Sequence, residues 1–560
     1  MTFKHATYIK QGIILLGSCC LFAIAYLMAS YFPVRIDLTA DKRYTLHISS
    51  KALLHELQAP IEIDIYLAGE LNTTFKQLQN SLCALLDEYK AYALHPITYR
   101  LIDINKEPLE QRKNLFKTLI DHGIQPTNVY KQEDGERTEK LIYPGIIINY
   151  QDQKVGGNIL KANSMLPLEV MIHQSIENLE YEVGSLLARL VQKQPLRIGL
   201  IEDHGGPKAG QLHGFIQALQ GLYAVQGITL SSDDLTQYAA VLMIKPQQTF
   251  SEAEKYKLDQ YIMRGGKVLF FIDRLQISMD NLGAGNSLAL PLELNLDDQL
   301  FRYGVRINQD LIQDLQSGIY PIIIGKMGNQ PQLQFLPWPF FPILNHFTDH
   351  VITKNMNAVY TQFVNSIDAV QVQDVVQIPL LCSSPYSIRT CMPVYVDLES
   401  LRKPPNAKLY NQGPIPVIYL LEGEFTSLYK NRLPPQGVDS GNFREKSLST
   451  KLLITSTSSI LFNAVSPKDR HPLPWGYDPF LQQHFANKDF VLNALAYMLE
   501  DQGIINIRHK TIRLRLVDSL KAKENKRYWQ FINVAGPIIV LCLLSGMCHV
   551  LRRRRYIKVN

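Results

Sequence analysis

The chain has 560 residues, of which 46% are hydrophobic and 19% charged, so it is long enough for several folded domains and is not disordered as a whole. Its net charge is +6, and two short tails without acidic residues carry +7 of it, so the rest of the chain has a net charge of −1. The basic residues of the tails are Lys4, Lys10, Arg552, Arg553, Arg554, Arg555 and Lys558. A nearly neutral body excludes an extended basic surface for nucleic acid, and we expect no such partner.

An apolar segment lies near each end of the chain. Residues 13–32 carry no charge, and residues 531–551 are interrupted only by Asn533, Pro537 and His549. Each is long enough to cross about 30 Å of hydrocarbon as a helix. We predict transmembrane helices at 11–32 and 531–551. We favour an uncleaved anchor over a signal peptide because the first apolar region is long and lacks a small-residue cleavage site.

The basic tails predict a topology. Lys and Arg in short segments beside a span stay on the cytoplasmic side, whereas long domains cross regardless of charge. Tails 1–10 and 552–560 are therefore predicted to be cytoplasmic, and the large domain between the spans to be periplasmic. The protein would be a two-pass component of the cell inner membrane, in contact with the lipid bilayer. A basic juxtamembrane segment at 509–530 leads into the second span.

The seven cysteines do not form a recognisable framework. Four lie in the apolar segments, and three lie between them: Cys83, Cys382 and Cys391. Three residues cannot form a closed set of disulfides, and no C-x-x-C spacing is present for zinc or redox chemistry. Whether Cys382 and Cys391 pair is left open by their spacing.

Residues 33–192 predict a first α/β domain. Ile61–Leu67 alternates apolar and acidic residues like a strand, residues 74–93 form an amphipathic helix, and Ile97–Ile104 is a second strand. A strand, helix and strand in this order indicate a parallel βαβ unit. A hairpin from Ile142 to the Gly156-Gly157 segment and a long helix after Pro167 complete a layout that could be thioredoxin-like, without redox cysteines.

Residues 193–300 predict a doubly wound, Rossmann-like α/β domain. Three apolar strands, at 196–201, 239–244 and 267–272, alternate with helices, and the second helix begins at the capping box of Ser251 and Glu254. Residues 301–445 are rich in proline and aromatic residues and predict a mixed, β-rich insertion. Residues 446–508 would then complete the α/β domain with one more strand and a helix.

Common catalytic motifs are absent from the sequence. It contains no G-x-x-x-x-G-K-[ST] loop, no G-x-G-x-x-G after a strand and no G-x-S-x-G elbow. His55-Glu56 begins a zinc-like motif, but Ala59 stands where a second histidine would be needed. We therefore expect no enzymatic activity, no cofactor and no metal.

Asp203-His204-Gly205-Gly206 is the main candidate for a ligand or partner site. It follows the first strand of the doubly wound domain, and open α/β sheets bind ligands at the carboxyl ends of their strands. Glycines there let backbone N–H groups approach a ligand closely. The alternative is a tight turn that holds a satisfied histidine.

Two further groups each have two interpretations. Trp338, Phe340 and Phe341 lie in a rigid proline-aromatic segment, which either packs over a sheet edge or forms a docking patch for a partner. The adjacent pairs Asp233-Asp234 and Asp297-Asp298 point their side chains apart, so a solvated or capping role is favoured over acid–base catalysis.

Several segments in order along the chain resemble the gliding-motility GldG family: residues 35–39, 41–46, 75–80, 86–89, 175–182, 303–308, 337–339, 421–427 and 487–494. The resemblance covers nearly the whole chain and both spans. It implies an auxiliary, or substrate-binding, component of an ABC transporter, with a separate permease subunit and a separate cytoplasmic ATPase subunit as partners. One departure is the turn Thr455–Ser459, which has only small hydroxyl residues where an acidic-glycine turn is expected.

The resemblance also implies that the middle α/β domain is similar to a domain of intraflagellar-transport proteins, distantly like amidotransferases. No cysteine stands at a nucleophile position for that activity. Our leading hypothesis is a non-catalytic, membrane-anchored periplasmic subunit of an ABC transport complex linked to gliding motility. The alternatives are an amidotransferase-like extracytoplasmic hydrolase and a structural scaffold of a motility or secretion machine.

Overall fold

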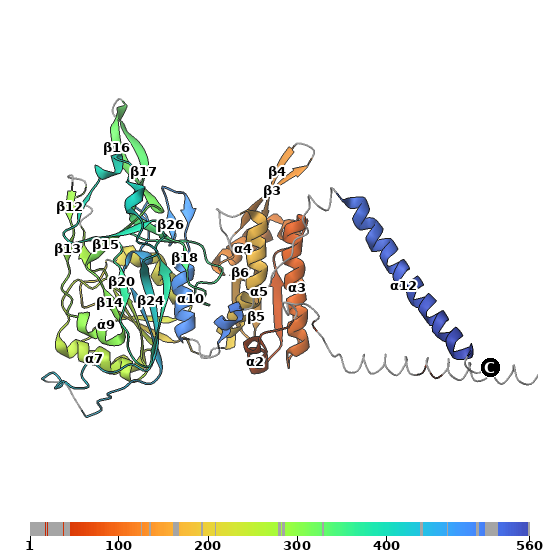
Figure 1. The fold of residues 1–560 in the computed structure, drawn as a ribbon, viewed down its shortest axis with the longest axis horizontal. Coiled ribbons are helices and arrows are strands. Elements are labelled where there is room, and N and C mark those ends of the chain that lie inside the picture. The colour runs from red at the N-terminus through yellow and green to blue at the C-terminus, as the bar shows by residue number, and fades with distance from the viewer. Residues whose placement is uncertain are drawn as a thin grey trace, which may run out of the picture. The chain divides into compact units, whose positions relative to one another are not determined.

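The computed structural model describes residues 17, 20, 37, 45–124, 126–133, 136–160, 167–191, 194–207, 209–277, 282, 286–327, 330–436, 441–466, 469–499, 503–509 and 525–557. The chain divides into two compact units, Met1–Thr511 and Ile512–Asn560, and each is described by itself (Figure 1). The predicted first span at 11–32 and most of the predicted segment 509–530 lie outside the described residues.

The first domain is built on a four-stranded sheet in the order β2-β1-β5-β6. β1 (Ile61–Ile65) and β2 (Ile97–Leu101) run parallel and are joined by α3 (Thr73–Tyr92), which confirms the predicted βαβ unit. β5 (Gly145–Tyr150) pairs antiparallel with both β1 and β6 (Gln153–Asn158), which confirms the predicted hairpin. The thioredoxin-like layout stays a prediction.

Two long amphipathic helices, α3 and α5 (Leu168–Val191), pack against each other in this domain. Asn72 caps α3 by accepting a hydrogen bond from the Phe75 N–H. The apolar residues of α5 recur every three or four positions, so that Leu179, Val183 and Leu186 are buried on one side. The remaining elements are α2 (Ile48–Glu56), η1 (Ile104–Lys106), α4 (Leu109–Asp121), β3 (Thr127–Glu133) and β4 (Glu136–Ile142).

The second domain is organised by an eight-stranded sheet in the order β18-β21-β24-β25-β10-β9-β7-β8. The five strands from β25 to β8 are parallel to one another, whereas β24, β21 and β18 run antiparallel to their neighbours. The parallel strands are β7 (Arg197–Ile201), β8 (Ala224–Ile228), β9 (Ala240–Ile244), β10 (Lys267–Phe271) and β25 (Thr450–Thr455). The antiparallel ones are β18 (His346–Phe347), β21 (Val375–Cys382) and β24 (Pro416–Gly423).

Helices cover both faces of this sheet, as predicted for a doubly wound domain. Leu242 of β9 lies in one core with residues of α6 (His213–Gln220) and α10 (Asn487–Leu499). Val241, the preceding residue, lies in a second core with residues of α7 (Glu252–Met263) and α9 (Asp297–Tyr303). Consecutive strand residues point to opposite faces, and β9 is apolar throughout because both faces are covered.

The predicted insertion at 301–445 needs a correction. β21 and β24 lie within it, yet both belong to the main sheet, where β24 pairs with β25. The apolar run of β24 indicates a strand but carries no local signal of its partner, because strand pairing is decided by contacts far apart in the chain. The insertion is therefore partly an antiparallel extension of the α/β sheet.

The other elements of this region form small sheets beside the main one. The largest is the hairpin of β16 (Ser317–Met327) and β17 (Gln330–Leu344), which extends away from the sheet (Figure 1). The other strands are β11 (Leu275–Gln276), β12 (Asn286–Leu288), β13 (Leu290–Pro291), β14 (Val305–Ile307), β15 (Asp310–Asp314), β19 (Val359–Tyr360), β20 (Ile367–Ala369), β22 (Ser387–Cys391), β23 (Tyr395–Asp397), β26 (Tyr477–Asp478) and β27 (Gln483–His484). Single turns are η2 (Ala209–Leu212), η3 (Leu235–Gln237), η4 (Ser400–Arg402), η5 (Ala407–Leu409), η6 (Ser459–Leu461) and η7 (Ile504–His509).

The proline-aromatic segment forms β17, and its large rings are internal. Trp338, Phe340 and Phe341 are 0%, 5% and 2% exposed, and Trp338 packs against Phe341 at 4.5 Å and Phe363 at 5.6 Å between ring centroids. The docking-patch interpretation of these three residues is thus corrected. Burying aromatic rings stabilises the small sheets more than an exposed patch would, since each ring removes a large apolar area from water.

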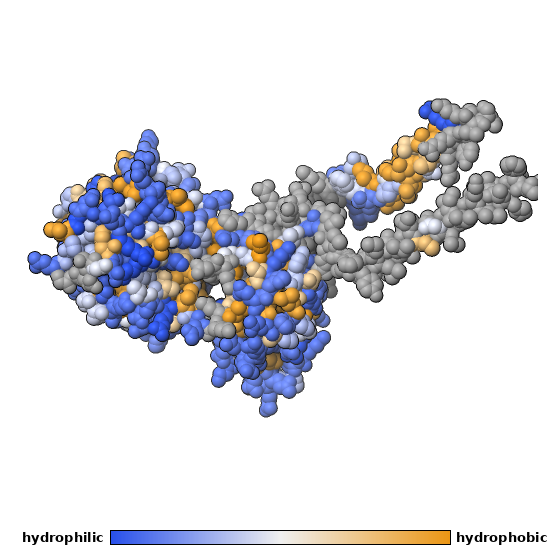
Figure 2. Space-filling model, turned by 90° about the horizontal axis from the view of Figure 1, so that it is seen from below, coloured by the Kyte–Doolittle hydropathy of each residue, from blue (hydrophilic) through white to orange (hydrophobic). Residues whose placement is uncertain are grey.

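The second unit contains one long helix, α12 (Lys526–Ile557). Residues Lys526–Leu551 are long and apolar enough to cross a membrane, with mean hydropathy 2.2 over the best window. The helix begins five residues before the predicted span at 531–551 and includes Tyr528 and Trp529 in its first turn. Figure 2 shows its apolar surface giving way to hydrophilic residues at the end that carries Arg553 and Arg554.

Replacing Trp338 by alanine should destabilise the second domain by about 3–5 kcal/mol, because it leaves a cavity in the aromatic core. Leu333→Ala on the same strand is the control. Leu333 is 49% exposed, so its truncation should cost less than about 1 kcal/mol. Urea unfolding of the full chain in detergent, followed by circular dichroism, measures both. Equal losses would contradict the internal position of Trp338.

Candidate functional site

The predicted loop Asp203–Gly206 follows β7 at the carboxyl edge of the parallel strands, where open α/β sheets bind ligands. Gly205 has φ +69°, a backbone conformation that residues other than glycine rarely adopt. A Cβ atom on Gly206 would lie 3.3 Å from the carbonyl oxygen of Ile244, at the end of β9. Gly205 is therefore favoured by the backbone conformation of the turn, and Gly206 by the close approach of the turn to the neighbouring strand.

His204 is enclosed by other residues. It is 5% exposed, and its ring stacks on Phe250 with the centroids 3.8 Å apart. Its Nδ1 lies 3.0 Å from Asp203 Oδ1, and its Nε2 lies 3.5 Å from Glu254 Oε2. Asp203 Oδ2 accepts a hydrogen bond from the Leu230 N–H. The histidine thus joins the loop after β7 to the first turn of α7.

Glu254 is held by the capping box of α7. Its carboxylate accepts hydrogen bonds from the backbone N–H and the hydroxyl of Ser251, at 2.9 and 2.6 Å. Burial would raise the pKa of Glu254, but the bonds from Ser251 and the proximity of His204 outweigh burial and lower it. The predicted capping box is confirmed, and it also positions a carboxylate against His204.

Asp203, His204 and Glu254 each offer one ligand atom within 4.8 Å of the others, which raises the question of a metal ion. The two carboxylates approach different nitrogens of the same imidazole, so they do not converge with one nitrogen on a single point. The geometry suits hydrogen bonds across the ring better than metal coordination. A structural role for Asp203–Gly206 accounts for all these contacts, and ligand or partner binding there stays a prediction.

The rest of the carboxyl edge is filled by the chain's own polar groups. Asp273, after β10, accepts hydrogen bonds from the backbone N–H and the hydroxyl of Ser458, at 2.6 and 2.7 Å. Lys245, after β9, has φ +47° and lies 3.7 Å from Asp273. Burial raises the pKa of Asp273, while Lys245 and Ser458 oppose that shift. The hydroxyl-rich turn at 455–459 therefore supplies donors to a largely enclosed carboxyl, whose side chain is 15% exposed.

The insertion contributes to the same edge. The side chain of Asn365 accepts a hydrogen bond from the Arg274 N–H at 2.9 Å and donates one to the Asp310 carbonyl at 2.6 Å. The Ser456 hydroxyl donates to the Asn365 carbonyl at 2.5 Å. These bonds join residues from the main sheet and from the insertion where a ligand would sit in an open α/β fold.

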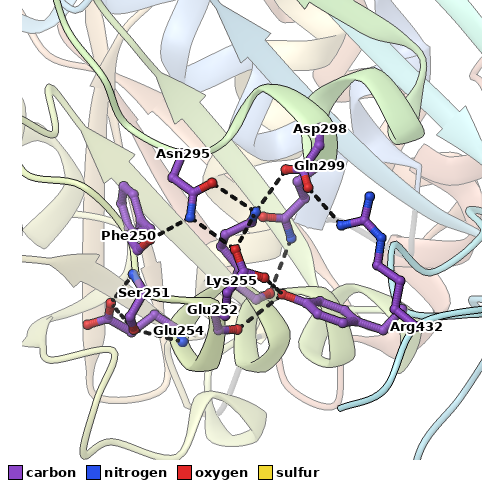
Figure 3. Close-up of polar contacts among 10 residues, drawn as sticks. Phe250, Ser251, Glu252, Glu254, Lys255, Asn295, Asp298, Gln299 and Arg432 are labelled. Carbon is purple, nitrogen blue, oxygen red and sulfur yellow. Dashed lines mark hydrogen bonds and ion pairs between the residues drawn. The ribbon is translucent and has the colours of Figure 1, made fainter. Parts of the chain in front are cut away.

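A second polar cluster surrounds Lys255 on α7, and sequence reasoning missed it (Figure 3). The Lys255 side chain is 0% exposed, and its Nζ lies 3.1 Å from Glu252, 3.3 Å from Asn295 and 2.8 Å from Asp298. Arg432 donates to the other oxygen of Asp298 at 2.9 Å. Burial opposes ionisation of Asp298, but the bonds from Lys255 and Arg432 lower its pKa below the usual value.

Asp259 lies one turn after Lys255 on the same helix and is fully buried. Its carboxylate accepts hydrogen bonds from the Tyr303 hydroxyl at 2.8 Å, the Ser427 hydroxyl at 2.6 Å and the Leu428 N–H at 3.0 Å. Together Lys255 and Asp259 fix α9 and the segment at 427–432 onto α7. Lys255 and Asp259 have opposite charges and lie four residues apart on the same helix, and this spacing was the sequence signal from which their role could have been predicted.

Asp297 and Asp298 lie in the first turn of α9, but the N-cap position of this helix is held by Leu296 without a side-chain cap hydrogen bond, so the predicted capping role is not observed for this pair. The structure adds ion pairs that adjacency in sequence did not indicate. Asp297 pairs with Arg274 at 2.9 Å, and Asp298 pairs with Lys255 and Arg432. These aspartates are therefore structural partners of basic residues from three other segments.

A nucleophile beside His204 is not apparent among the described residues. No serine hydroxyl or cysteine thiol bonds to its ring, which contacts Asp203, Glu254 and Phe250. Cys83, Cys382 and Cys391 are free, and burial raises the pKa of Cys382 to about 11, which disfavours the reactive thiolate. The sequence left open whether Cys382 and Cys391 pair, and in this structure they are unpaired thiols.

Three comparisons with known proteins bear on this chain. A family model described as "ABC-type uncharacterized transport system" matches residues 195–494, and a model of a domain of unknown function matches residues 40–149. No match was found among curated proteins. A solved "mmIFT52 N-terminal domain" is similar at 11% identity and a TM-score of 0.30, over 54% of this chain and 96% of that one.

Lys255→Met should destabilise the second domain by about 2 kcal/mol. The loss is below the usual cost of breaking a buried pair because Glu252 and Asp298 keep some access to water. Lys257→Met, two residues along α7, is the control and should cost less than about 0.5 kcal/mol, since Lys257 is half-buried and forms no ion pair among the described residues. Chemical denaturation of the full-length variants measures both, and equal effects would contradict the role of Lys255.

The cost of Lys255→Met should also depend on pH. The pKa values of Glu252 and Asp298 are lowered in the folded chain, so their contribution to stability is present above the unfolded carboxyl pKa and is lost as the pH falls through the folded values. The stability difference between wild type and variant should therefore shrink below about pH 4. A difference that stays constant from pH 7 to pH 3 would show that these carboxylates do not depend on Lys255.

Proposed function

Because the chain belongs to the family described as an ABC-type uncharacterized transport system, we propose that it is a membrane-anchored auxiliary subunit of an ABC transporter complex. The match covers residues 195–494 and thus the whole main sheet of the second domain. This family match is the observation that carries the proposal. An auxiliary subunit of a transport system associates with the other transporter components.

The finer proposal concerns the partners. The sequence has no phosphate-binding loop for ATP, so ATP hydrolysis would come from a separate cytoplasmic ATPase subunit, coupled to a separate permease. α12 provides a helix suited to lateral contact with a permease. It carries small residues, Gly536 and Gly546, at which an added Cβ would meet nothing within 4 Å in this chain. Small residues let membrane helices approach closely.

The placement is also part of the proposal. The Lys and Arg residues after the span favour a cytoplasmic C-terminus, and with the first apolar segment they favour two spans with a periplasmic domain between them. The resemblance to the GldG family supports a link to gliding motility. The protein would be non-catalytic, which is supported by the absence of a serine or cysteine bonded to His204 among the described residues.

A structural scaffold is the second candidate function. The carboxyl edge of the parallel strands, where a ligand would enter, is filled by Asp273, Ser458 and Asn365. This favours bracing of a machine over ligand capture at that edge. The two functions differ in their dependence on transport. If inactivating the ATPase partner produces the same phenotype as deleting this protein, the transport role is supported. If inactivating the ATPase does not produce that phenotype, the scaffold role is supported.

Tagged full-length protein, extracted from native membranes in mild detergent, should co-purify with an ABC permease and an ABC ATPase identified by mass spectrometry. Replacing Gly536 and Gly546 by leucine should reduce this recovery about tenfold, because larger side chains separate packed helices. Val540→Leu on the same helix keeps the apolar character and should leave recovery unchanged. Absence of both partners from the wild-type sample would refute the transporter assignment.

A further inference from the structure

A cavity of about 740 Å³ lies beside the Lys255 cluster in the second domain. It is lined by α9, by β14 with the turn after it, by the segment at 428–432 and by Arg274. Lys255 and Asp259 fix two of these elements, α9 and the segment at 428–432, onto α7. Its volume is within the range of small-ligand sites, about 300–1,000 Å³. The walls are therefore held in place by buried interactions and do not depend on a ligand for their position.

Positive charge dominates this cavity. Five basic residues line it, against two acidic ones, for a net charge of +3: Arg274, Arg302, Arg306, Lys430 and Arg432 face Asp297 and Asp298. The body of the chain outside the basic tails is nearly neutral, so this is a local concentration of charge. Gathering like charges is unfavourable unless an anion compensates them.

The two acidic residues cannot compensate this charge, because they are already shared. Asp297 pairs with Arg274, and Asp298 is held between buried Lys255 and Arg432, as Figure 3 shows. Since Lys255 itself adds a positive charge behind Asp298, that carboxylate has little left to offer to the cavity. The remaining arginines therefore have no acidic partner within the cavity and can bind an anion that enters it.

Arg302 and Arg306 form no ion pair or side-chain hydrogen bond within the part of the chain that the structure describes, and both are exposed at the cavity. Arg306 lies opposite Asp368 in the β14/β20 ladder, but Asp368 instead accepts bonds from Arg389 at 3.0 Å and Asn308 at 2.7 Å. Two guanidinium groups thus line the cavity with their donors unused.

Arg274 also lines the cavity, but it is already bonded within the chain. Its side chain is 3% exposed, and two of its nitrogens bond to the Leu292 carbonyl and to Asp297. Its Nε has no hydrogen-bond partner among the described residues, but this atom is buried from solvent. Arg274 therefore contributes positive charge to the cavity wall, and the accessible donors are those of Arg302 and Arg306.

We propose that this cavity, hereafter the arginine pocket, binds a small multivalent anion that carries phosphate groups. Guanidinium groups present paired donors that match phosphate oxygens, and they bind such anions better than a lysine point charge does. Lys430 pairs with Glu445 at 3.7 Å, which leaves two guanidinium groups without an ionic partner, and these suit a ligand with at least two negative charges. The proposal goes beyond the transporter assignment and does not depend on it.

Titration of the full chain in nanodiscs of net-neutral lipid tests the proposal, with inorganic pyrophosphate as the probe and calorimetry as the readout. We expect saturable one-to-one binding that weakens as salt is added. Arg302→Gln and Arg306→Gln should each raise the Kd about tenfold, since each removes a charge-assisted hydrogen bond. Arg197→Gln, an exposed arginine at the opposite, amino end of β7, should leave the Kd unchanged.

Asp297→Asn separates electrostatics from structural damage. It removes a negative charge and frees Arg274, so pyrophosphate should bind about threefold to tenfold more tightly, whereas a disturbed fold would weaken binding. No binding to wild type, or equal affinity of Arg302→Gln and Arg197→Gln, would overturn the proposal. Weaker binding by an Asp297→Asn variant that unfolds at the same denaturant concentration as wild type would also overturn it. Stronger binding of citrate than of pyrophosphate would overturn the phosphate class.

Two sources of the phosphate group are distinguished by the lipid. If phosphatidylglycerol in the nanodisc competes with pyrophosphate, the pocket takes a lipid headgroup. If it does not compete, the pocket takes a soluble phosphate compound, and both results support the shared chemistry. Because co-purification reports on protein partners and calorimetry on an anion, failure of one leaves the other standing.

Discussion

The second domain depends on one constraint, which is that a charged or polar side chain can be buried only if ionic or hydrogen-bonding partners surround it. Lys255 and Asp259 meet this constraint on consecutive turns of α7 by drawing on α9 and on the segment at 427–432. Segments more than 150 residues apart in the chain are thereby held at fixed positions, and the arginine pocket lies where they meet.

The same constraint governs the carboxyl edge of the parallel strands. In an open α/β domain this edge is where a ligand would supply the missing hydrogen bonds. Here Ser458 and Lys245 are the hydrogen-bonding and ionic partners of Asp273. The side chain of Asn365 bonds to the backbone of Arg274 and of Asp310. The edge is thus filled by residues of the main domain and of the insertion, and the arginine pocket is lined by α9, the end of β14 and the segment at 428–432.

Membership of an ABC transport family and a long apolar helix fit one arrangement, a folded domain retained at a membrane beside transporter components. α12 is exposed along its apolar length within its own unit, so burial of that surface must come from lipid or from other helices. The polar cavity of the first unit is suited to contact with an anion, whereas the apolar helix of the second unit is suited to contact with lipid or other helices.

Elements with a local signal could be predicted from the sequence. The βαβ unit, the capping box of Ser251 and Glu254, the strands at 196–201 and 239–244 and the apolar C-terminal helix follow from hydrophobic period and cap residues. For His204 the sequence left a ligand site and a tight turn as alternatives, and it did not indicate Phe250 or Glu254 as its partners. The folded chain was needed to show that β21 and β24 join the main sheet, that Trp338 is internal, and that Arg274, Arg302, Arg306 and Arg432 line one cavity. Strand pairing and charge clustering depend on contacts between distant segments, which no local period or spacing encodes.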